Sequence, residues 1–234
     1  MMDKAIAITL QSLRSRNLTG IFAESAEDAK NKILALIPAN AVVERNDSTT
    51  VTQIGVIEAL KKRGTKVLER GDDQVKRPIS SDVFLTGTNA ITQDGRLVDV
   101  DFVGNRIAGI VWGHPSTIIV VGRNKIVKNL EEAFYRVRNI IAPNHVRIRA
   151  VELGGRPRDT PCVVTGKCID CRVRDRVCNV FVIIEGKPYR IELTVMLINE
   201  DFGLGWDEFW PKERIAKIIE NYKKFVWVPS RPTN

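Results

Sequence analysis

Residues 116–122 read STIIVVG, and this stretch decides the fold class. It is a continuous run of mainly β-branched residues between turn-forming residues, which is typical of a strand covered on both faces of a sheet. Shorter apolar stretches at 42–43, 83–85 and 97–100 predict further strands. Because segments with helical periodicity alternate with these strands, the first 150 residues predict an α/β fold with a parallel sheet.

Apolar residues at helical spacing predict the helices that would flank this sheet. We expect them at about 1–17, 25–36, 54–60, 104–111 and 125–141, with a last helix that starts at Pro211. Two apolar stretches near the end of the chain, 180–184 and 189–198, are separated by Gly186-Lys-Pro, which predicts a β-hairpin or ribbon. We interpret residues 1–234 as one domain, since no obvious linker or repeat interrupts them.

The composition indicates a soluble globular protein and limits the classes of ligand that it is expected to bind. Of the 234 residues, 44% are hydrophobic and 27% charged, and no apolar run approaches the ~20 residues of a membrane span. The N-terminus does not resemble a secretory signal, so we expect a cytoplasmic protein. The net charge of +8 suits an anionic partner, but the absence of a basic run and the 6% aromatic content disfavour nucleic acid. A small anionic metabolite is the expected ligand.

Two polar turns follow the carboxyl ends of predicted strands, where parallel sheets bind their ligands. The first contains Asn46, Asp47, Ser48 and Thr49 and leads into a helix, as in sites where a helix N-terminus faces an anion. Ordinary helix capping explains the same residues, and both roles are compatible.

The second turn is richer in candidate ligand-binding groups. Gly87 permits close approach of the backbone, beside Thr88, and Asn89 offers both a donor and an acceptor. Shortly afterwards the triplet Gly104, Asn105 and Arg106 brings a guanidinium that binds a carboxylate or phosphate bidentately, unless Arg106 is simply a surface residue. No residue is assigned a catalytic role.

All four cysteines lie between residues 160 and 178, at Cys162, Cys168, Cys171 and Cys178. The central Cys-x2-Cys lets two thiolates grip one ion, and the flanking cysteines are near enough to complete four ligands, which suits zinc or an iron–sulfur cluster. Disulfide or redox chemistry and purely structural thiols remain alternatives, because the spacing matches no standard metal motif.

The stretch 82–98, DVFLTGTNAITQDGRLV, followed by GNRIA at 104–108, resembles the hallmark of the LUD (lactate utilisation) domain family, formerly a domain of unknown function. The cysteine segment 160–179 is similar to a cysteine-bearing subgroup, and the whole is similar to the lactate-utilisation protein C group. The resemblance spans roughly residues 5 to 225. It implies a Rossmann-like, mostly parallel sheet of the sugar-phosphate isomerase and CoA-transferase type, with a small cysteine-bearing loop and a β-ribbon insertion.

The resemblance also implies a role in oxidising L-lactate to pyruvate, within a complex whose partner subunits carry iron–sulfur clusters. Relatives with isomerase chemistry place an Asp where this chain has Asn89, and an amide cannot act as a carboxylate base. Three hypotheses therefore stay open. They are a subunit of an organic-acid oxidising system with an iron–sulfur cluster, a metabolite-binding or transferase-like enzyme with structural zinc, and a non-catalytic redox or assembly module.

Overall fold

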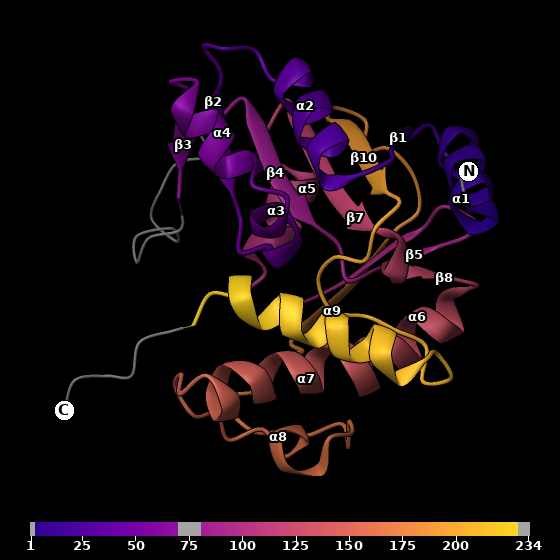
Figure 1. The fold of residues 1–234 in the computed structure, drawn as a ribbon, viewed down its shortest axis with the longest axis vertical. Coiled ribbons are helices and arrows are strands. Elements are labelled where there is room, and N and C mark those ends of the chain that lie inside the picture. The colour runs from indigo at the N-terminus through magenta and orange to yellow at the C-terminus, as the bar shows by residue number, and fades with distance from the viewer. Residues whose placement is uncertain (1–2, 70–80, 229–234) are drawn as a thin grey trace.

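The computed structural model describes residues 3–69 and 81–228, which form two sheets and their covering helices (Figure 1). The strands are β1 Thr19–Ala23, β2 Val42–Arg45, β3 Lys66–Leu68, β4 Val83–Gly87, β5 Ala90–Thr92, β6 Leu97–Asp101, β7 Ser116–Gly122, β8 Ile126–Val127, β9 Val180–Ile184 and β10 Glu192–Ile198. The α-helices are α1 Lys4–Ser15, α2 Ala26–Leu36, α3 Thr49–Gln53, α4 Val56–Lys62, α5 Asn105–Val111, α6 Leu130–Arg136, α7 Ala142–Arg147, α8 Cys162–Thr165 and α9 Lys212–Phe225.

The main sheet has six strands in the order β1-β10-β7-β4-β2-β3, and every neighbouring pair is parallel. Alternate residues of β7 enter different cores: Ile118 packs with α2 and α4, whereas Ile119 packs with α1 and α5. The sheet is therefore covered on both faces, as the β-branched run 116–122 requires. The predicted α/β fold with a mostly parallel sheet flanked by helices is confirmed.

The second sheet corrects the expected pairing of the last two strands. Its order is β8-β5-β6-β9, and β9 pairs antiparallel with β6. β10 instead lies between β1 and β7 of the main sheet, so segments 180–184 and 189–198 form no hairpin with each other. The physical reason is burial, because β10 is buried along most of its length and needs neighbours on both edges, whereas β9 is only partly buried.

The helix expected at 125–141 is wrong at its start. Residues 123–125 form a 3₁₀ turn, β8 follows, and α6 begins at Leu130. Asn129 caps α6, because its side chain accepts a hydrogen bond from the Glu132 N–H at 2.9 Å. Helical structure then continues beyond Ile141, through α7 and a π-helical turn that ends at Glu152. Lys125 therefore lies at the end of the 3₁₀ turn, before β8 and outside α6.

The cysteine segment lies beside α7, on the side away from the main sheet, where Figure 1 shows the short α8. A third apolar core joins α6, the π-helical turns on either side of α7, and α9 to the second sheet, with Ala133, Val137 and Tyr222 among its buried members. None of the described helices has the length and apolarity needed to cross a membrane.

Candidate functional site

The turns that follow β2 and β4 meet at one cavity. These strands are parallel neighbours, so their carboxyl ends lie at the same edge of the sheet. The cavity has a volume of about 290 Å³. Of the ten residues predicted to bind a ligand, the lining includes Asn46, Asp47, Ser48, Thr49, Gly87, Thr88, Asn89, Asn105 and Arg106. The tenth, Gly104, precedes α5 as its N-cap.

The two turns pack directly against each other at Gly87. A Cβ atom at this position would lie 2.7 Å from the Ser48 hydroxyl oxygen and 3.3 Å from the Val120 carbonyl oxygen, so only glycine lets the turns approach this closely. The Ser48 hydroxyl also accepts a hydrogen bond of 3.4 Å from the Val51 N–H and caps α3. The predicted capping role of this turn is thus confirmed.

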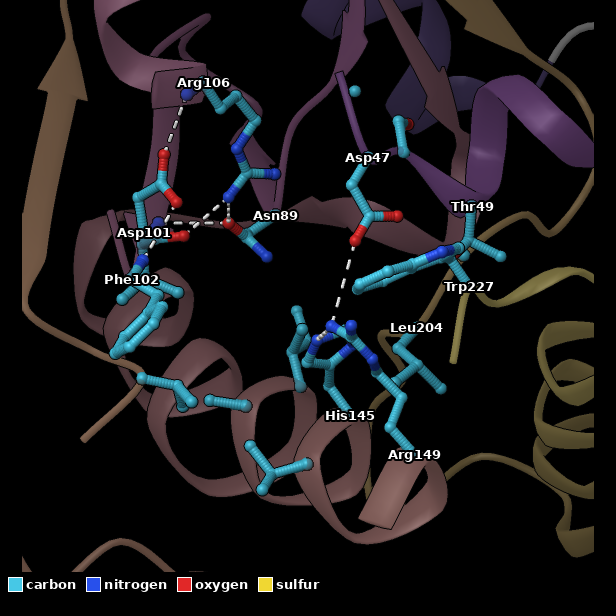
Figure 2. Close-up of a pocket in the computed structure, with 18 of the residues that line it drawn as sticks. Asp47, Thr49, Asn89, Asp101, Phe102, Arg106, His145, Arg149, Leu204 and Trp227 are labelled. Carbon is cyan, nitrogen blue, oxygen red and sulfur yellow. Dashed lines mark hydrogen bonds and ion pairs between the residues drawn. The ribbon is translucent and has the colours of Figure 1, made fainter. Parts of the chain in front are cut away.

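Asn89 presents a fixed hydrogen-bond donor to the cavity. Its Oδ1 accepts hydrogen bonds from the Val100 N–H at 3.0 Å and from Arg106 Nη2 at 2.7 Å. Because both partners are donors, the amide cannot be flipped, and Nδ2 must be the atom on the other side. In Figure 2 this nitrogen points into the cavity, and no acceptor within residues 3–69 or 81–228 is hydrogen-bonded to it. A donor held in this way suits an oxygen atom of a ligand.

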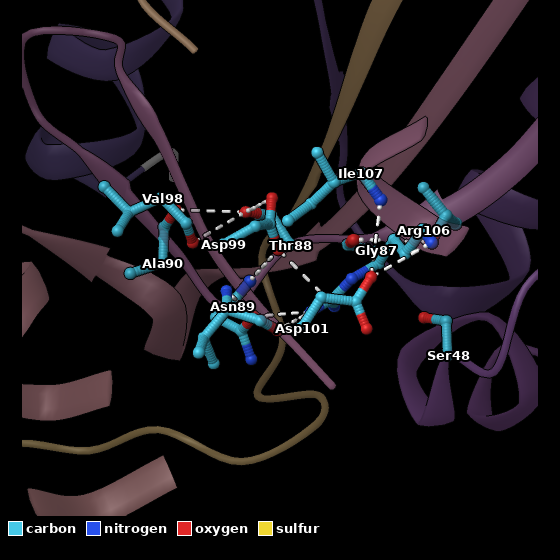
Figure 3. A network of polar contacts seen from close by, with 12 residues as sticks. Ser48, Gly87, Thr88, Asn89, Ala90, Val98, Asp99, Asp101, Arg106 and Ile107 are labelled. Carbon is cyan, nitrogen blue, oxygen red and sulfur yellow. Dashed lines mark hydrogen bonds and ion pairs between the residues drawn. The ribbon is translucent and has the colours of Figure 1, made fainter. Parts of the chain in front are cut away.

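Arg106 positions Asn89 in addition to lining the cavity (Figure 3). Besides Asn89, its Nη2 donates to the Val100 carbonyl, and its Nη1 lies 3.4 Å from Oδ1 of Asp99. Asp99 is fully buried and also accepts from the Thr88 hydroxyl at 2.9 Å and from the Asn89 N–H at 3.0 Å. The guanidinium expected to clamp a ligand therefore has three protein acceptors, and it holds the second turn in shape.

Asp101 lines the same side of the cavity, and its side chain accepts hydrogen bonds from the first turn of α5. Its carboxylate accepts hydrogen bonds from the N–H groups of Phe102 at 2.9 Å, Arg106 at 3.0 Å and Ile107 at 3.4 Å. These three backbone donors stabilise the carboxylate and offset part of its negative charge, which reduces its repulsion of an anion in the cavity.

Lys125 is a buried basic side chain in the cavity wall, and no sequence motif marks it as a ligand-binding residue. Its Nζ donates to the Thr50 hydroxyl at 3.0 Å and to the Thr88 carbonyl at 2.8 Å, both of which are uncharged groups. Burial and the charge of Arg106 lower the pKa of Lys125 to about 7, although Asp99 acts in the opposite direction. The signal in the sequence was its place directly after the buried strand 116–122, at the ligand-binding edge of the sheet.

The opposite wall comes from α7 and the helical turn after it. Figure 2 shows Arg149 and His145 reaching the cavity from the side facing Arg106 and Asn89. Arg149 Nη1 donates to Nε2 of His145 at 2.8 Å, and because a guanidinium only donates, Nδ1 carries the imidazole proton and donates to the Tyr222 oxygen. Arg149 Nη1 also lies 3.8 Å from Asp47, and its guanidinium stacks 4.9 Å from the Trp227 ring.

The four cysteines surround a separate, smaller cavity of about 20 Å³ on the other side of α7. All four are partly buried free thiols. Burial raises the pKa of Cys178 to about 11, with the neighbouring thiols adding to the shift and Arg176 opposing it. Within the described ranges, no three metal-ligating side chains are yet disposed to hold an ion, and about 20 Å³ is room for little more than one water molecule. The four thiols line one cavity, but in their present positions they do not form the ligand set of a metal ion.

A parallel sheet covered on both faces, with a polar cavity where β2, β4 and β7 end, defines a Rossmann-like α/β protein. The chain belongs to the LUD domain family, whose model matches residues 6–198. This family is linked in general to lactate utilisation.

Comparison with individual proteins adds little beyond the family. Among solved structures, the chain is similar to a DUF162 family protein from Deinococcus radiodurans, with 15% sequence identity and a TM-score of 0.49. That similarity covers 84% of this chain and 97% of the other. No protein with a curated description matches the chain.

Proposed function

We propose that this protein binds a small organic-acid anion in the cavity at the ends of β2 and β4, as a subunit or accessory of a system that oxidises L-lactate to pyruvate. The single observation that carries the proposal is the orientation of Asn89, whose Nδ2 faces the cavity because its Oδ1 already accepts two hydrogen bonds. Membership of the LUD domain family supports the choice of a hydroxy acid or its oxo acid.

The charges of the lining support an anion over a neutral or cationic ligand. Its cationic side chains are Arg106, Lys125, Arg149, Arg156 and Arg158, and its carboxylates are Asp47 and Asp101. With the buried Asp99, which lies 3.4 Å from Arg106, three carboxylates stand against these five basic side chains, and Lys125 has a pKa of about 7, so a small excess of positive charge remains. A carboxylate that enters this partly buried site gains charge-assisted hydrogen bonds.

We further propose that Cys162, Cys168, Cys171 and Cys178 hold an iron–sulfur cluster or a zinc ion, with iron–sulfur subunits of a lactate-oxidising complex as partners. The support is the gathering of four thiols around one cavity. Loading requires the segment to close or rearrange around the metal, because the thiols are not yet disposed as ligands. A resident iron–sulfur cluster would supply electron transfer, and zinc would supply structural stability.

The anion site is tested by Asn89→Asp. The new side chain keeps an acceptor for Val100 and Arg106 but replaces the donor that faces the cavity with a carboxylate oxygen. We expect the affinity for L-lactate or pyruvate, measured by isothermal titration calorimetry, to fall roughly 10- to 100-fold, the loss of a hydrogen bond to a charged group plus repulsion. The melting temperature should stay within a few degrees. Unchanged affinity in a folded variant would refute the site.

Elemental analysis of protein purified without oxygen tests the metal site. Iron at about four atoms per chain supports the cluster, and zinc at about one supports a transferase-like protein with structural zinc. Protein that contains neither metal, even after reconstitution with iron and sulfide or with zinc, contradicts both. The Cys168→Ser/Cys171→Ser variant is the control, since it should lose the metal that the unmodified chain retains.

A further inference from the structure

The buried amine of Lys125 has hydrogen-bond partners but no counter-ion. The side chain lines the cavity with 7% of its surface exposed, and its Nζ donates to the Thr50 hydroxyl at 3.0 Å and to the Thr88 carbonyl at 2.8 Å. None of the ion pairs within residues 3–69 and 81–228 involves it, and the nearby Asp99 lies 3.4 Å from the Arg106 guanidinium instead. Because burying an ammonium group without a paired carboxylate is costly, this environment favours the neutral amine.

A neutral lysine amine is a nucleophile, whereas the ammonium ion is not. Burial and the positive charge of Arg106 lower the pKa of Lys125 to about 7, so about half of the amine is neutral at pH 7. An exposed lysine with a pKa of about 10.4 is neutral in fewer than about one molecule in a thousand at the same pH. Desolvation and a neighbouring cation are the two conditions that activate lysines toward carbonyl groups, and Lys125 meets both.

The hydrogen bonds of Lys125 leave its lone pair unused. A neutral amine has two N–H bonds, and Thr50 and Thr88 accept both of them. Gly203 flanks the same nitrogen, since a Cβ atom at this glycine would lie only 2.8 Å from Nζ. Gly203, Thr50 and Thr88 all line the cavity together with Lys125. The amine is therefore surrounded by wall residues of one cavity, and no side chain at position 203 covers it.

The donor proposed for the ligand carboxylate is one residue away from an acceptor of this amine. The Thr88 carbonyl accepts from Lys125, and the next residue, Asn89, directs its Nδ2 into the cavity. Both residues also bind the buried Asp99, through the Thr88 hydroxyl at 2.9 Å and the Asn89 N–H at 3.0 Å, which holds the turn in one shape (Figure 3). In a 2-oxo acid the carbonyl carbon is bonded directly to the carboxylate carbon. One small ligand can thus place its carboxylate at Asn89 and its carbonyl carbon at Lys125.

We infer that Lys125 binds a 2-oxo acid such as pyruvate covalently, as an imine between its Nζ and the carbonyl carbon of the ligand. The inference rests on the proposed function, because it takes Asn89 to be the donor to the ligand carboxylate. It deepens that function by selecting the oxo acid over the hydroxy acid and by naming the residue that captures it.

The reaction consumes no oxidant or reductant and releases only water. The Nζ lone pair attacks the carbonyl carbon, a C–N bond forms, and the carbonyl oxygen takes up a proton that the nitrogen releases. The resulting carbinolamine loses its hydroxyl group and the remaining N–H proton as water, which leaves a C=N double bond. When this imine is protonated, it keeps a positive charge beside the ligand carboxylate. L-Lactate has a hydroxyl group in place of the oxo group and cannot react in this way.

Reductive trapping tests the inference. The protein is incubated at pH 7 with pyruvate and sodium cyanoborohydride, which reduces an imine to a stable secondary amine, and the modified lysines are located by peptide mass mapping. We expect one adduct per chain, at Lys125, formed about tenfold or more faster than at any exposed lysine, because a larger fraction of its amine is neutral. L-Lactate should slow this labelling, since it occupies the carboxylate position without reacting.

Two controls accompany the trapping. Lys125→Met should lose the adduct, and Lys128→Met, at an exposed position three residues away, should retain it. A second measurement needs no variant, because it compares lysines within the unmodified chain. The ratio of labelling at Lys125 to labelling at exposed lysines should fall from pH 7 to pH 9, since the exposed amines are still gaining their neutral form when most of Lys125 is already neutral.

The outcomes separate this inference from the proposed function. If pyruvate and lactate bind in calorimetry but Lys125 is labelled no faster than exposed lysines, the imine is wrong and the organic-acid site stands. If neither acid binds and Lys125 carries no adduct, both proposals are wrong. An adduct at Lys125 that lactate does not slow, in protein that binds lactate, would overturn the placement of the carboxylate at Asn89.

Discussion

At the scale of single residues, the cavity obtains its donors by different means. Asn89 is neutral and becomes a one-sided donor because Val100 and Arg106 occupy its oxygen. Lys125 is charged only in part near neutral pH, because its Nζ is buried against uncharged oxygens. Hydrogen bonds set the orientation of the Asn89 amide, which does not titrate. Desolvation lowers the pKa of Lys125, so only Lys125 changes its charge with pH.

Lys125 makes anion binding pH-dependent. A bound anion favours the ammonium form and raises the pKa of Lys125 above the value of about 7 in the free protein. Between these two pKa values the complex holds more protons than the free protein, so affinity is full below pH 7 and falls as pH rises above it. We expect the dissociation constant for the anion to rise by up to about tenfold per pH unit in this window. Titration calorimetry from pH 6 to 9 measures the slope.

Lys125→Met should abolish this slope, whereas Lys128→Met, at an exposed position three residues away, should retain it. A slope that persists in the Lys125 variant would mean that another group titrates on binding.

At the scale of elements, the loop between β10 and α9 forms part of the cavity wall through Gly203 and Leu204. Gly203 adopts a positive φ of 68°, and its N–H donates to Gln53 at 2.7 Å. A Cβ atom at Gly203 would lie 2.7 Å from the Thr50 hydroxyl and 2.8 Å from Lys125 Nζ. The loop therefore fits against Lys125 only without a side chain at this position.

Gly203→Ala should reduce both stability and anion affinity. Its matched control is Gly55→Ala, because Gly55 has the same φ of 68° but nothing within 4 Å of the added Cβ. The control carries only the backbone strain, about 1–2 kcal/mol, and the Gly203 variant carries a further ~1–3 kcal/mol of overpacking. Urea denaturation measures the free energy of unfolding. Equal losses in the two variants would show that the contact with Lys125 and Thr50 relaxes without cost.

At the scale of the whole molecule, the ligand cavity and the cysteine cavity share a wall. Ala142 and Val177 line both, so α7 and the end of the cysteine segment separate them by a single layer of side chains. Arg156 and Arg158, which line the ligand cavity, and the four thiols also lie on one continuous stretch of the chain, from Arg156 to Cys178. We therefore expect a change in the order of the cysteine segment to alter the affinity of the ligand cavity.

Metal removal should weaken anion binding several-fold. A metal that ties the four thiols together restrains Val177 and the segment after Arg158, and a flexible wall costs ordering free energy when the ligand binds. Titration of the same anion into metal-loaded and chelator-treated protein measures the difference. The Cys168→Ser/Cys171→Ser variant should match the chelated protein. Identical affinities in all three preparations would show that the two cavities are independent.

The sequence predicted the positions of helices and strands better than it predicted which strands pair. The strands at 83–87 and 116–122 and the helices at 4–15 and 26–36 follow from local apolar periodicity, and the predictions near them hold. The strand Thr19–Ala23 was not predicted. It has only five residues, and most of them are half-buried, so its apolar pattern is weak. The pairing of β9 and β10 was wrong, since adjacency in sequence does not decide which sheet edge is open.

The parallel α/β class, the two polar turns at strand ends and the clustering of four cysteines could be predicted from the sequence, because each depends on residues close together in the chain. The contact of Lys125 with Thr50, 75 residues away, and that of His145 with Tyr222, 77 residues away, arise only when the chain folds. Folding also decides which side of the Asn89 amide faces the cavity. Hydrogen bonds and desolvation act between groups that folding brings together, and no local pattern records which groups those will be.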